Sequence, residues 1–537
     1  MNNIFPKLLP FPVTKNIIEI AKQHRFLTGL AIFYILSVIW GAYRFYSPIP
    51  QGDMWHGYVD FYLHLLDGDK SAWWGQHNEH RIIFSRILFY LDLAFLGGQS
   101  RLLVPVNVIF MMSMWYMILV YANKFIYNKI DNKHFYYIVV LITVFAYSWK
   151  QDENITWAFQ SVFWAAYIFP LLAFYFLARS AINKEKELMY FIASASFGIL
   201  SAGTMANGIL ALPLMVVMAV FIRKKYSYTL ILTVLALMVV IPFLYYYQTP
   251  AEHTSFIDNV LNFPLRTVVF FIEYVGAPPK SIVVSFILGL AHLYMIYIAI
   301  KNIRQHKDNP LYISIIAFLL YYLATAIATS GGRVEHGINS ALVGRYTTPA
   351  ILAILLSLIL YLYNRPEHIR YFSKRTITII AVLMLGTQAR IIIKNIDRIH
   401  DSEYVQAMQL EMGIHKKQHF QAIASEARLK NITIFGVDPI RDKRELLGTT
   451  INKNKCKKID YDNSKDLADR NTAAHNTTKV SVEDALPPYV VLYATDASNI
   501  VTGYALSIRE TRHVVHVIRQ GNNLIDKKNL FLYLCNK

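Results

Sequence analysis

Residues 102–122 of this chain read LLVPVNVIFMMSMWYMILVYA, a run without a single charged side chain. As an α-helix, a run of this length is about 30 Å long, which matches the apolar core of a bilayer. Similar runs recur as far as residue 392, and lysines and arginines gather in the short links between them. The sequence therefore predicts a membrane protein that crosses the bilayer many times.

We expect an all-α bundle of about 11 transmembrane helices. Only 16% of the residues are charged, against about a quarter in soluble proteins. The expected spans are residues 27–43, 102–122, 136–149, 157–178, 188–203, 206–222, 227–247, 281–300, 311–329, 347–363 and 376–392. The two short spans 188–203 and 206–222 are expected to form a hairpin.

Basic links set the expected orientation, because lysines and arginines next to membrane spans stay in the cytoplasm. Residues 1–26 carry four basic residues and one acid, and no small-residue cleavage site follows, so the first span is retained and starts inside. The later basic links all fall inside if the short segment 82–98 does not cross. We expect that segment to be an amphipathic or re-entrant part of the first external loop.

The basic residues in these links explain the net charge of +18. The sequence contains no basic patch interleaved with aromatic residues, so we do not expect nucleic-acid binding. With 11 spans, we expect residues 393–537 to form an external, soluble α+β domain, which lies in the periplasm if the chain belongs to a Gram-negative bacterium. In it we expect a helix at 401–428, strands at 432–437, 489–494, 513–518 and 530–534, and a long loop or partly disordered link at 440–485. Both cysteines, Cys456 and Cys535, lie here, either as a disulfide or as free thiols.

Residues 51–81 read QGDMWHGYVDFYLHLLDGDKSAWWGQHNEHR and hold a density of polar side chains that a simple loop does not need. A transporter needs ionisable groups at the midplane of its spans, and those are nearly absent here. The expected site therefore lies at the outer membrane surface, within reach of a lipid headgroup.

Asp53, directly after the first span, is our candidate general base, because apolar surroundings can bring a carboxylate into the range useful for taking a proton. The alternative role is a helix N-cap for residues 54–66. Asp60, one helical face away, is the second candidate catalytic residue. Asp67 and Asp69 flank Gly68 and are typical turn residues.

The remaining candidates bind substrate. Asn78 and Glu79 suit sugar hydroxyls and Arg81 a phosphate, while a metal site from His77, Glu79 and His80 is an open alternative. Trp73 and Trp74 stack on a sugar or belong to an interfacial aromatic belt. Arg345 pairs with phosphate or anchors in the headgroups. The candidate substrate-binding set is Trp55, Trp73, Trp74, His77, Asn78, Glu79, His80, Arg81, Gln160, Glu273, Arg333, Arg345 and Tyr346.

The order of these features resembles a family. An aspartate follows the first span, a His-Asn-Glu-His-Arg segment comes next, and Trp-x-Phe-Gln, Asn-Gly and Gly-Arg-Tyr open later segments. Over residues 27–365 this order resembles bacterial polytopic glycosyltransferases of the C-type superfamily, including serotype-converting O-antigen glucosyltransferases.

The resemblance implies a sugar donor linked to undecaprenyl phosphate and a glycan acceptor on the periplasmic face. It also implies Asp53 as base and Arg81 and Arg345 as phosphate ligands. No Asp-x-Asp motif stands beside Asp53, so a divalent metal cofactor stays an open question. The expected function is transfer of a hexose, such as glucose. The alternatives are a translocator of polysaccharide or lipid-linked sugar, and a structural subunit of an assembly complex.

Overall fold

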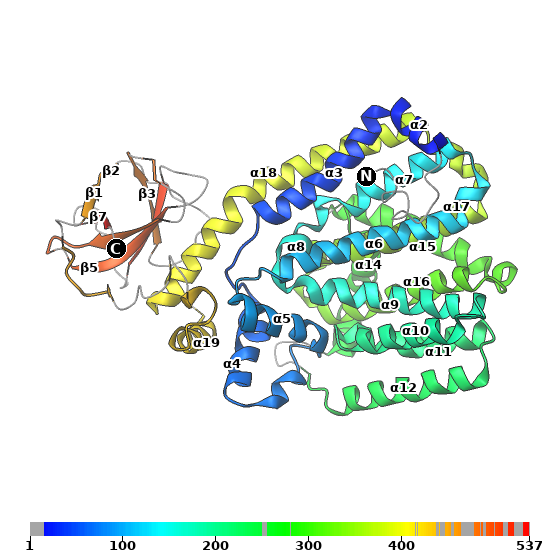
Figure 1. The fold of residues 1–537 in the computed structure, drawn as a ribbon, viewed down its shortest axis with the longest axis horizontal. Coiled ribbons are helices and arrows are strands. Elements are labelled where there is room, and N and C mark those ends of the chain that lie inside the picture. Colours follow the sequence, from blue (N-terminus) through cyan, green and yellow to red (C-terminus); the bar gives the residue numbers. More distant parts are fainter. Residues whose placement is uncertain are drawn as a thin grey trace. The chain divides into compact units, whose positions relative to one another are not determined.

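A computed structural model shows a mostly helical chain with a β-sheet near its C-terminal end (Figure 1). The structure describes residues 15–249, 255–279, 281–413, 415, 417–436, 440, 446–452, 456–462, 477–483, 485–486, 490–498, 500–507, 514–519 and 530–535. The chain divides into two compact units. The first unit comprises residues 1–46, 74–87 and 103–391, and the second comprises residues 47–73, 88–102 and 392–537.

Within the described residues, eight helices are long and apolar enough to cross a membrane. They are α3 (Arg25–Arg44), α6 (Leu103–Phe125), α9 (Ser161–Ile182), α12 (Tyr226–Tyr245), α15 (Ile282–Lys301), α16 (Pro310–Arg333), α17 (Thr347–Asn364) and the first part of α18 (Lys374–Met412). This result confirms the prediction of a multi-span helical protein.

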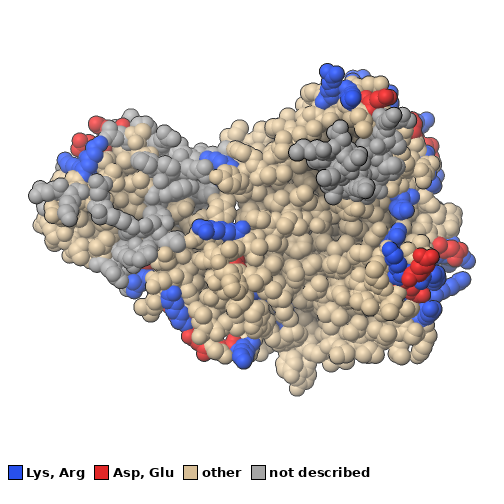
Figure 2. All heavy atoms as spheres, viewed as in Figure 1, with Lys and Arg blue, Asp and Glu red and all other residues tan. Residues whose placement is uncertain are grey.

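These helices differ in how much of their surface the protein itself covers. The apolar window of α17 is 83% buried and that of α9 is 78% buried, whereas the windows of α12 and α18 are only 17% buried. Apolar helices that the protein leaves uncovered are expected to face lipid. On the face drawn in Figure 2, the helices of the first unit show a broad surface with few charged side chains, which gather at its edges.

Three predicted spans form shorter helices, namely α7 (Asn132–Ala146), α10 (Glu187–Ala202) and α11 (Ala211–Phe221). At 1.5 Å per residue they are about 22, 24 and 16 Å long, less than the ~30 Å bilayer core. The turn η6 (Ala206–Leu210) joins α10 to α11, so the two helices follow each other as in the predicted hairpin. The segment expected not to cross forms α5 (Ile83–Leu96), which is also too short.

Hydroxyl groups and glycines allow the helices of the first unit to pack closely. The Tyr321 hydroxyl donates to the carbonyl of Ala166 at 2.6 Å, which joins α16 to α9. A Cβ added at Gly276 would lie 2.0 Å from the carbonyl oxygen of Ser285, so only glycine permits this approach at the end of α14 (Pro264–Val275). Small residues and buried hydroxyls of this kind are typical of helix contacts in membrane proteins.

The link between α12 and α15 holds two helices that the sequence did not predict, α13 (Phe256–Asn262) and α14. Pro264 at the first position of α14 is favourable there, because its missing N–H is not needed. The remaining short elements of the first unit are α2 (Lys15–Gln23), η3 (Tyr127–Lys129), η4 (Trp149–Gln151), α8 (Asp152–Thr156), η5 (Ala158–Gln160), η7 (Ile303–His306), η8 (Val334–His336), η9 (Ile338–Leu342), η10 (Gly344–Tyr346) and η11 (Pro366–Tyr371).

Within its described residues, the second unit contains an antiparallel sheet of seven strands in the order β1-β7-β4-β5-β6-β3-β2. Buried aliphatic side chains such as Leu492, Val517 and Leu532 form its core. The strands are β1 (Cys456–Ile459), β2 (Tyr461–Asp462), β3 (Thr477–Val482), β4 (Val491–Thr495), β5 (Val501–Ser507), β6 (Val514–Arg519) and β7 (Phe531–Cys535). Its other elements are η1 (Trp55–Asp60), α4 (Phe61–Leu66), η2 (Lys70–Trp73), α19 (Gln418–Leu429) and η12 (Thr433–Gly436).

Comparison with the expected strands gives a mixed result. The strands predicted at 489–494, 513–518 and 530–534 correspond to β4, β6 and β7, although residues 489 and 513 lie outside the described residues. The strand predicted at 432–437 is wrong, because residues 433–436 form the 3-10 helix η12. The stretch 440–485, predicted as a loop or partly disordered link, contains β1, β2 and β3, and its residues 441–445, 453–455, 463–476 and 484 lie outside the described residues.

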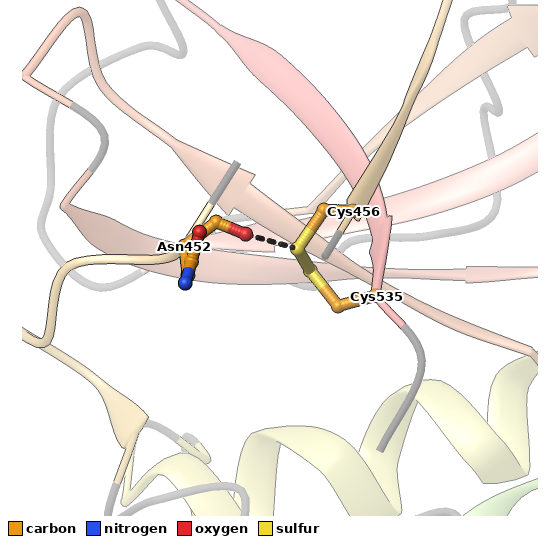
Figure 3. The surroundings of a disulfide bond; sticks show 3 residues. All are labelled: Asn452, Cys456 and Cys535. Atoms are coloured by element: carbon orange, nitrogen blue, oxygen red, sulfur yellow. Dashed lines mark hydrogen bonds between the residues drawn. A yellow bond between two sulfur atoms is a disulfide. The ribbon is translucent and has the colours of Figure 1, made fainter. Parts of the chain in front are cut away.

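Cys456 and Cys535 form a disulfide, which settles the alternative left open by the sequence (Figure 3). The two cysteines face each other in the register of β1 and β7. The bond closes a loop of 79 residues in sequence separation. It therefore links β1 to β7, which are neighbours in the sheet and are the first and the last of the described strands in chain order.

Candidate functional site

The polar segment of the first unit forms a tight turn. His77 and His80 pair as a β-bridge, with each backbone N–H donating to the other's carbonyl at 2.8 Å. Asn78, between them, has φ 49°, a left-handed conformation that asparagine tolerates better than most residues. The Gln76 side chain bonds the backbone of Asn78 and of Gln248. These bonds attach the turn to the segment that follows α12.

Glu79 is held by a cation from a distant helix. Its carboxylate accepts from Arg333, at the end of α16, at 3.0 Å, and lies 3.7 Å from His80 Nε2. The backbone N–H of Ala206 donates to His80 Nδ1, so a neutral His80 carries its proton on Nε2, toward Glu79. Glu79, expected to bind a sugar hydroxyl, therefore already contributes to an ion pair between the turn and α16.

Arg81 is the most unusual charge of this segment. The residue is only 5% exposed, and its guanidinium donates to the carbonyls of Trp74 and Tyr246 at 2.6 Å. The guanidinium lies 5.2 Å from the centre of the Trp74 ring. Burial lowers the pKa of Arg81, and within the described residues no carboxylate pairs with it. A buried cation held only by neutral groups is prepared to bind an anion.

Arg86 adds a second buried guanidinium that the sequence did not identify as a site residue. It is also 5% exposed and donates to the carbonyl of Gly75. Burial, and then repulsion by Arg81, lowers the pKa of Arg86 to about 10. The indication in the sequence was an arginine inside the apolar segment 82–98, a costly position unless it has a purpose.

The other two candidate phosphate ligands already have carboxylate partners. Arg333 pairs with Glu79, and Arg345 Nη1 lies 3.7 Å from Glu153 Oε1. Glu153 Oε2 also accepts from the backbone N–H of Arg345 at 3.0 Å. Glu153 belongs to the QDEN link, which the sequence did not connect with Arg345. This difference favours Arg81 over Arg333 and Arg345 as the anion ligand.

Further candidates in the first unit lie in packed surroundings. The His77 ring lies 5.3 Å from Phe159, next to the buried Gln160, whose Oε1 has no hydrogen-bond partner among the described residues. Tyr346 is buried, and its ring lies 4.8 Å from that of Tyr274. The Tyr346 side chain therefore packs inside the helical bundle.

Glu273 on α14 is fully buried. Both of its carboxylate oxygens are without a hydrogen-bond partner in the part of the chain that the structure describes. Burial raises the pKa of Glu273 to about 7, so this carboxyl is about half protonated at neutral pH and mostly protonated one pH unit below it. A carboxyl in this state is suited to exchange a proton or to bind a hydroxyl.

Asp53 and Asp60, the candidate bases, belong to the second unit. Asp53 directly precedes the helical segment, and its carbonyl accepts from Gly57. Its carboxylate makes no capping hydrogen bond with any described residue, so the alternative role as N-cap finds no support. Asp60 ends the π-helix η1, a rare element often found at functional sites.

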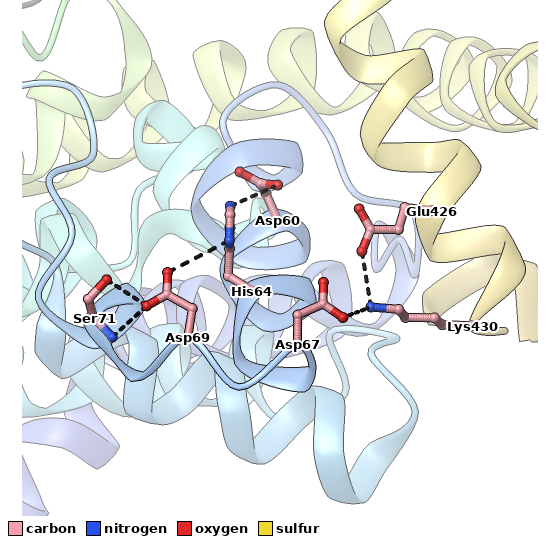
Figure 4. A network of polar contacts seen from close by, with 7 residues as sticks. All are labelled: Asp60, His64, Asp67, Asp69, Ser71, Glu426 and Lys430. Carbon is pink, nitrogen blue, oxygen red and sulfur yellow. Dashed lines mark hydrogen bonds and ion pairs between the residues drawn. The ribbon is translucent and has the colours of Figure 1, made fainter.

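Asp60 belongs to a polar network that Figure 4 shows from close by. His64 lies 3.9 Å from Asp60 and 3.8 Å from Asp69. Burial raises the pKa of the half-buried Asp60, and His64 opposes this effect. Asp69 accepts from both the backbone N–H and the hydroxyl of Ser71, as expected for a turn residue.

Two of the candidate tryptophans pack within the second unit. Trp55 is 2% exposed, and its ring lies 6.4 Å from Phe420 and 6.3 Å from Phe435. The Trp73 ring packs on Phe61 at 5.1 Å and on Tyr90 at 5.7 Å. Trp55 is therefore part of the protein core. Trp74, in the first unit, is exposed and lies beside Arg81.

Comparisons of the chain with family models, curated proteins and solved structures found no match. Within the described residues, no three histidine, cysteine or acidic side chains are grouped as metal ligands. The set His77, Glu79 and His80 is thus not arranged as a metal site. The geometry offers two buried arginines near an exposed tryptophan, and a buried carboxyl.

Proposed function

We propose that the chain is a membrane glycosyltransferase that takes a hexosyl group, such as glucosyl, from a polyprenyl phosphate. The acceptor is a periplasmic glycan such as O-antigen. The observation that supports this proposal best is Arg81, a buried guanidinium without a carboxylate partner among the described residues. A donor phosphate would supply the missing anion, and the exposed ring of Trp74 beside it offers an apolar surface for the sugar.

We further propose that the eight long helices and the three short ones give eleven membrane segments in a bacterial inner membrane. The basic links then place the N-terminus in the cytoplasm and the C-terminal domain in the periplasm. The disulfide supports this orientation, because disulfides persist in oxidising compartments.

In the proposed reaction the acceptor hydroxyl oxygen attacks the anomeric carbon of the donor. Asp53 takes the hydroxyl proton, with Asp60 as the second candidate for this role. The bond from the anomeric carbon to the phosphate oxygen breaks, and its electron pair leaves with the polyprenyl phosphate. Arg81 stabilises the negative charge of this leaving group. A single displacement inverts the anomeric centre.

The test uses the purified full-length protein with a polyprenyl-phosphate hexose and an acceptor glycan. Charge-assisted hydrogen bonds contribute about 1.5–3 kcal/mol, so Arg81→Gln should lower kcat/KM by about 10–100-fold. Arg81→Lys, which keeps the charge, should retain part of the activity. Asp53→Asn should lower kcat while donor binding persists.

The matched control is Arg266→Gln. Arg266 is an exposed arginine whose guanidinium lies 5.3 Å from the Phe263 ring, much as Arg81 lies near Trp74. The Arg266→Gln variant should retain wild-type activity. If Arg81→Gln folds and turns over like this control, the phosphate role of Arg81 is refuted. If the wild-type protein forms no product but moves the lipid-linked sugar across a vesicle membrane, the protein is a translocator instead.

A further inference from the structure

A cavity of about 550 Å³ lies in the first unit, outside the site described above. We call it the basic pocket. It is formed where α2 meets α3 and where α18 begins. Its lining residues are Lys22, Gln23, His24, Arg25, Phe26, Leu27 and Lys374. Its volume falls within the range of small-molecule sites, about 300–1,000 Å³.

The pocket carries positive charge without compensation by acids. Lys22, Arg25 and Lys374 line it, no carboxylate does, and no ion pair joins these three cations to any described acid. Lys374 is also the first residue of α18, where the helix dipole adds positive potential. Asp131, the acid next to Lys133 at the start of α7, is bound to His134 at 2.8 Å.

His24, which also lines the pocket, is influenced by the neighbouring lysines. Its Nε2 lies 3.1 Å from the hydroxyl of Tyr137, and its Nδ1 is buried with no partner among the described residues. Burial lowers the pKa of His24, and repulsion by Lys374 and Lys133 lowers it further. The two charged side chains that act on the His24 imidazole, Lys374 and Lys133, are thus both cations, and an anion in the pocket would offset their positive charge.

Two apolar helices run side by side away from the pocket. The buried Tyr34 hydroxyl of α3 donates to the carbonyl of Ala381 on α18 at 2.8 Å. Beside the basic residues, both helices expose large apolar side chains, with Phe26 60% and Leu383 67% exposed. A basic head region that continues into an exposed apolar surface matches the two parts of a phospholipid.

We propose that the basic pocket binds the phosphate headgroup of an anionic phospholipid whose acyl chains lie along α3 and α18. Lys22, Arg25 and Lys374 neutralise the phosphate. The apolar surfaces of the two helices distinguish a lipid from a free phosphate ion. The site is independent of the proposed transferase reaction, because it uses none of the residues assigned to it.

The test measures lipid binding to the purified full-length protein by native mass spectrometry, with phosphatidylglycerol or phosphatidylcholine added in detergent. The wild type should retain phosphatidylglycerol in preference to phosphatidylcholine. Each cation near a membrane surface contributes roughly a fivefold factor, so the variant Lys22→Gln/Arg25→Gln/Lys374→Gln should bind phosphatidylglycerol roughly 100-fold more weakly. The single variant Arg25→Glu should also weaken phosphatidylglycerol binding, by a smaller factor than the triple variant.

The control variant Lys301→Gln/Arg304→Gln/Lys307→Gln removes the same charge from three exposed basic residues of another link. It should bind phosphatidylglycerol like the wild type. Equal weakening in both triple variants would overturn the proposal, since any basic link would then suffice. Displacement of the lipid by millimolar inorganic phosphate would also overturn it, because the pocket would then be a site for free phosphate.

Discussion

Replacing Cys456 and Cys535 by serine should destabilise the sheet of the second unit. The disulfide closes a loop of 79 residues, and the loss of its chain-entropy constraint costs about 4.5 kcal/mol for a loop of this length. A domain is typically stable by only 5–15 kcal/mol, so the change is a large fraction of the total. With a urea dependence of about 2 kcal/mol per molar, the unfolding midpoint should fall by about 2 M.

Pulse proteolysis in urea measures this midpoint on the full-length protein, with the intact C-terminus detected by a tag. The wild type treated with a reductant is the internal control. It should match the double variant, whose midpoint should not respond to the reductant. If the midpoints of oxidised wild type, reduced wild type and the variant agree within 0.3 M, roughly 0.6 kcal/mol, the stabilising role of the disulfide is refuted.

Three further predictions follow from individual residues. Burial raises the pKa of Glu273 to about 7, so the ionised form destabilises the fold as pH rises from about 4.5 to 7. Glu273→Gln should match the wild type in thermal melts at pH 4 and be more stable by about 3 kcal/mol at pH 8, whereas a pH-independent difference would contradict this. Asn78→Gly should leave the stability unchanged, whereas Asn78→Val should lower it by about 1–2 kcal/mol, because the backbone of residue 78 is left-handed. Equal melting temperatures of the two variants would argue against backbone strain. Phe420→Ala should lower the free energy of unfolding by about 3–5 kcal/mol and change the fluorescence of Trp55. An unaltered fluorescence spectrum would contradict this contact.

Hydropathy was sufficient for the long helices, because the length of an uncharged run alone decides whether it can cross a bilayer. α12 and α15 were predicted within a few residues for this reason. The same method missed α14, since a helix of 12 residues inside a polar link has no comparable length requirement. It also missed β1 and β3, whose polar residues resemble those of a loop.

The sequence identified the residue types of the candidate site but could not identify how these residues pair. The sequence shows that Arg81, Arg333 and Arg345 are unusual arginines, yet it cannot show that Glu79 and Glu153 pair with the last two. Ion pairs between residues more than 190 positions apart depend on the tertiary fold. Only the three-dimensional arrangement therefore distinguishes Arg81 from the other two.

The order in which the second unit is assembled has a consequence for biosynthesis. Its segments 47–73 and 88–102 are made early, but the segment that supplies Phe420 and Phe435 follows more than 300 residues later. At 5–20 residues per second, the ribosome needs about 15–60 s to reach it. During that time the early segments lack the partners that bury Trp55. A nascent chain halted before residue 418 should therefore be cleaved by protease near residue 55, and a completed chain should be protected.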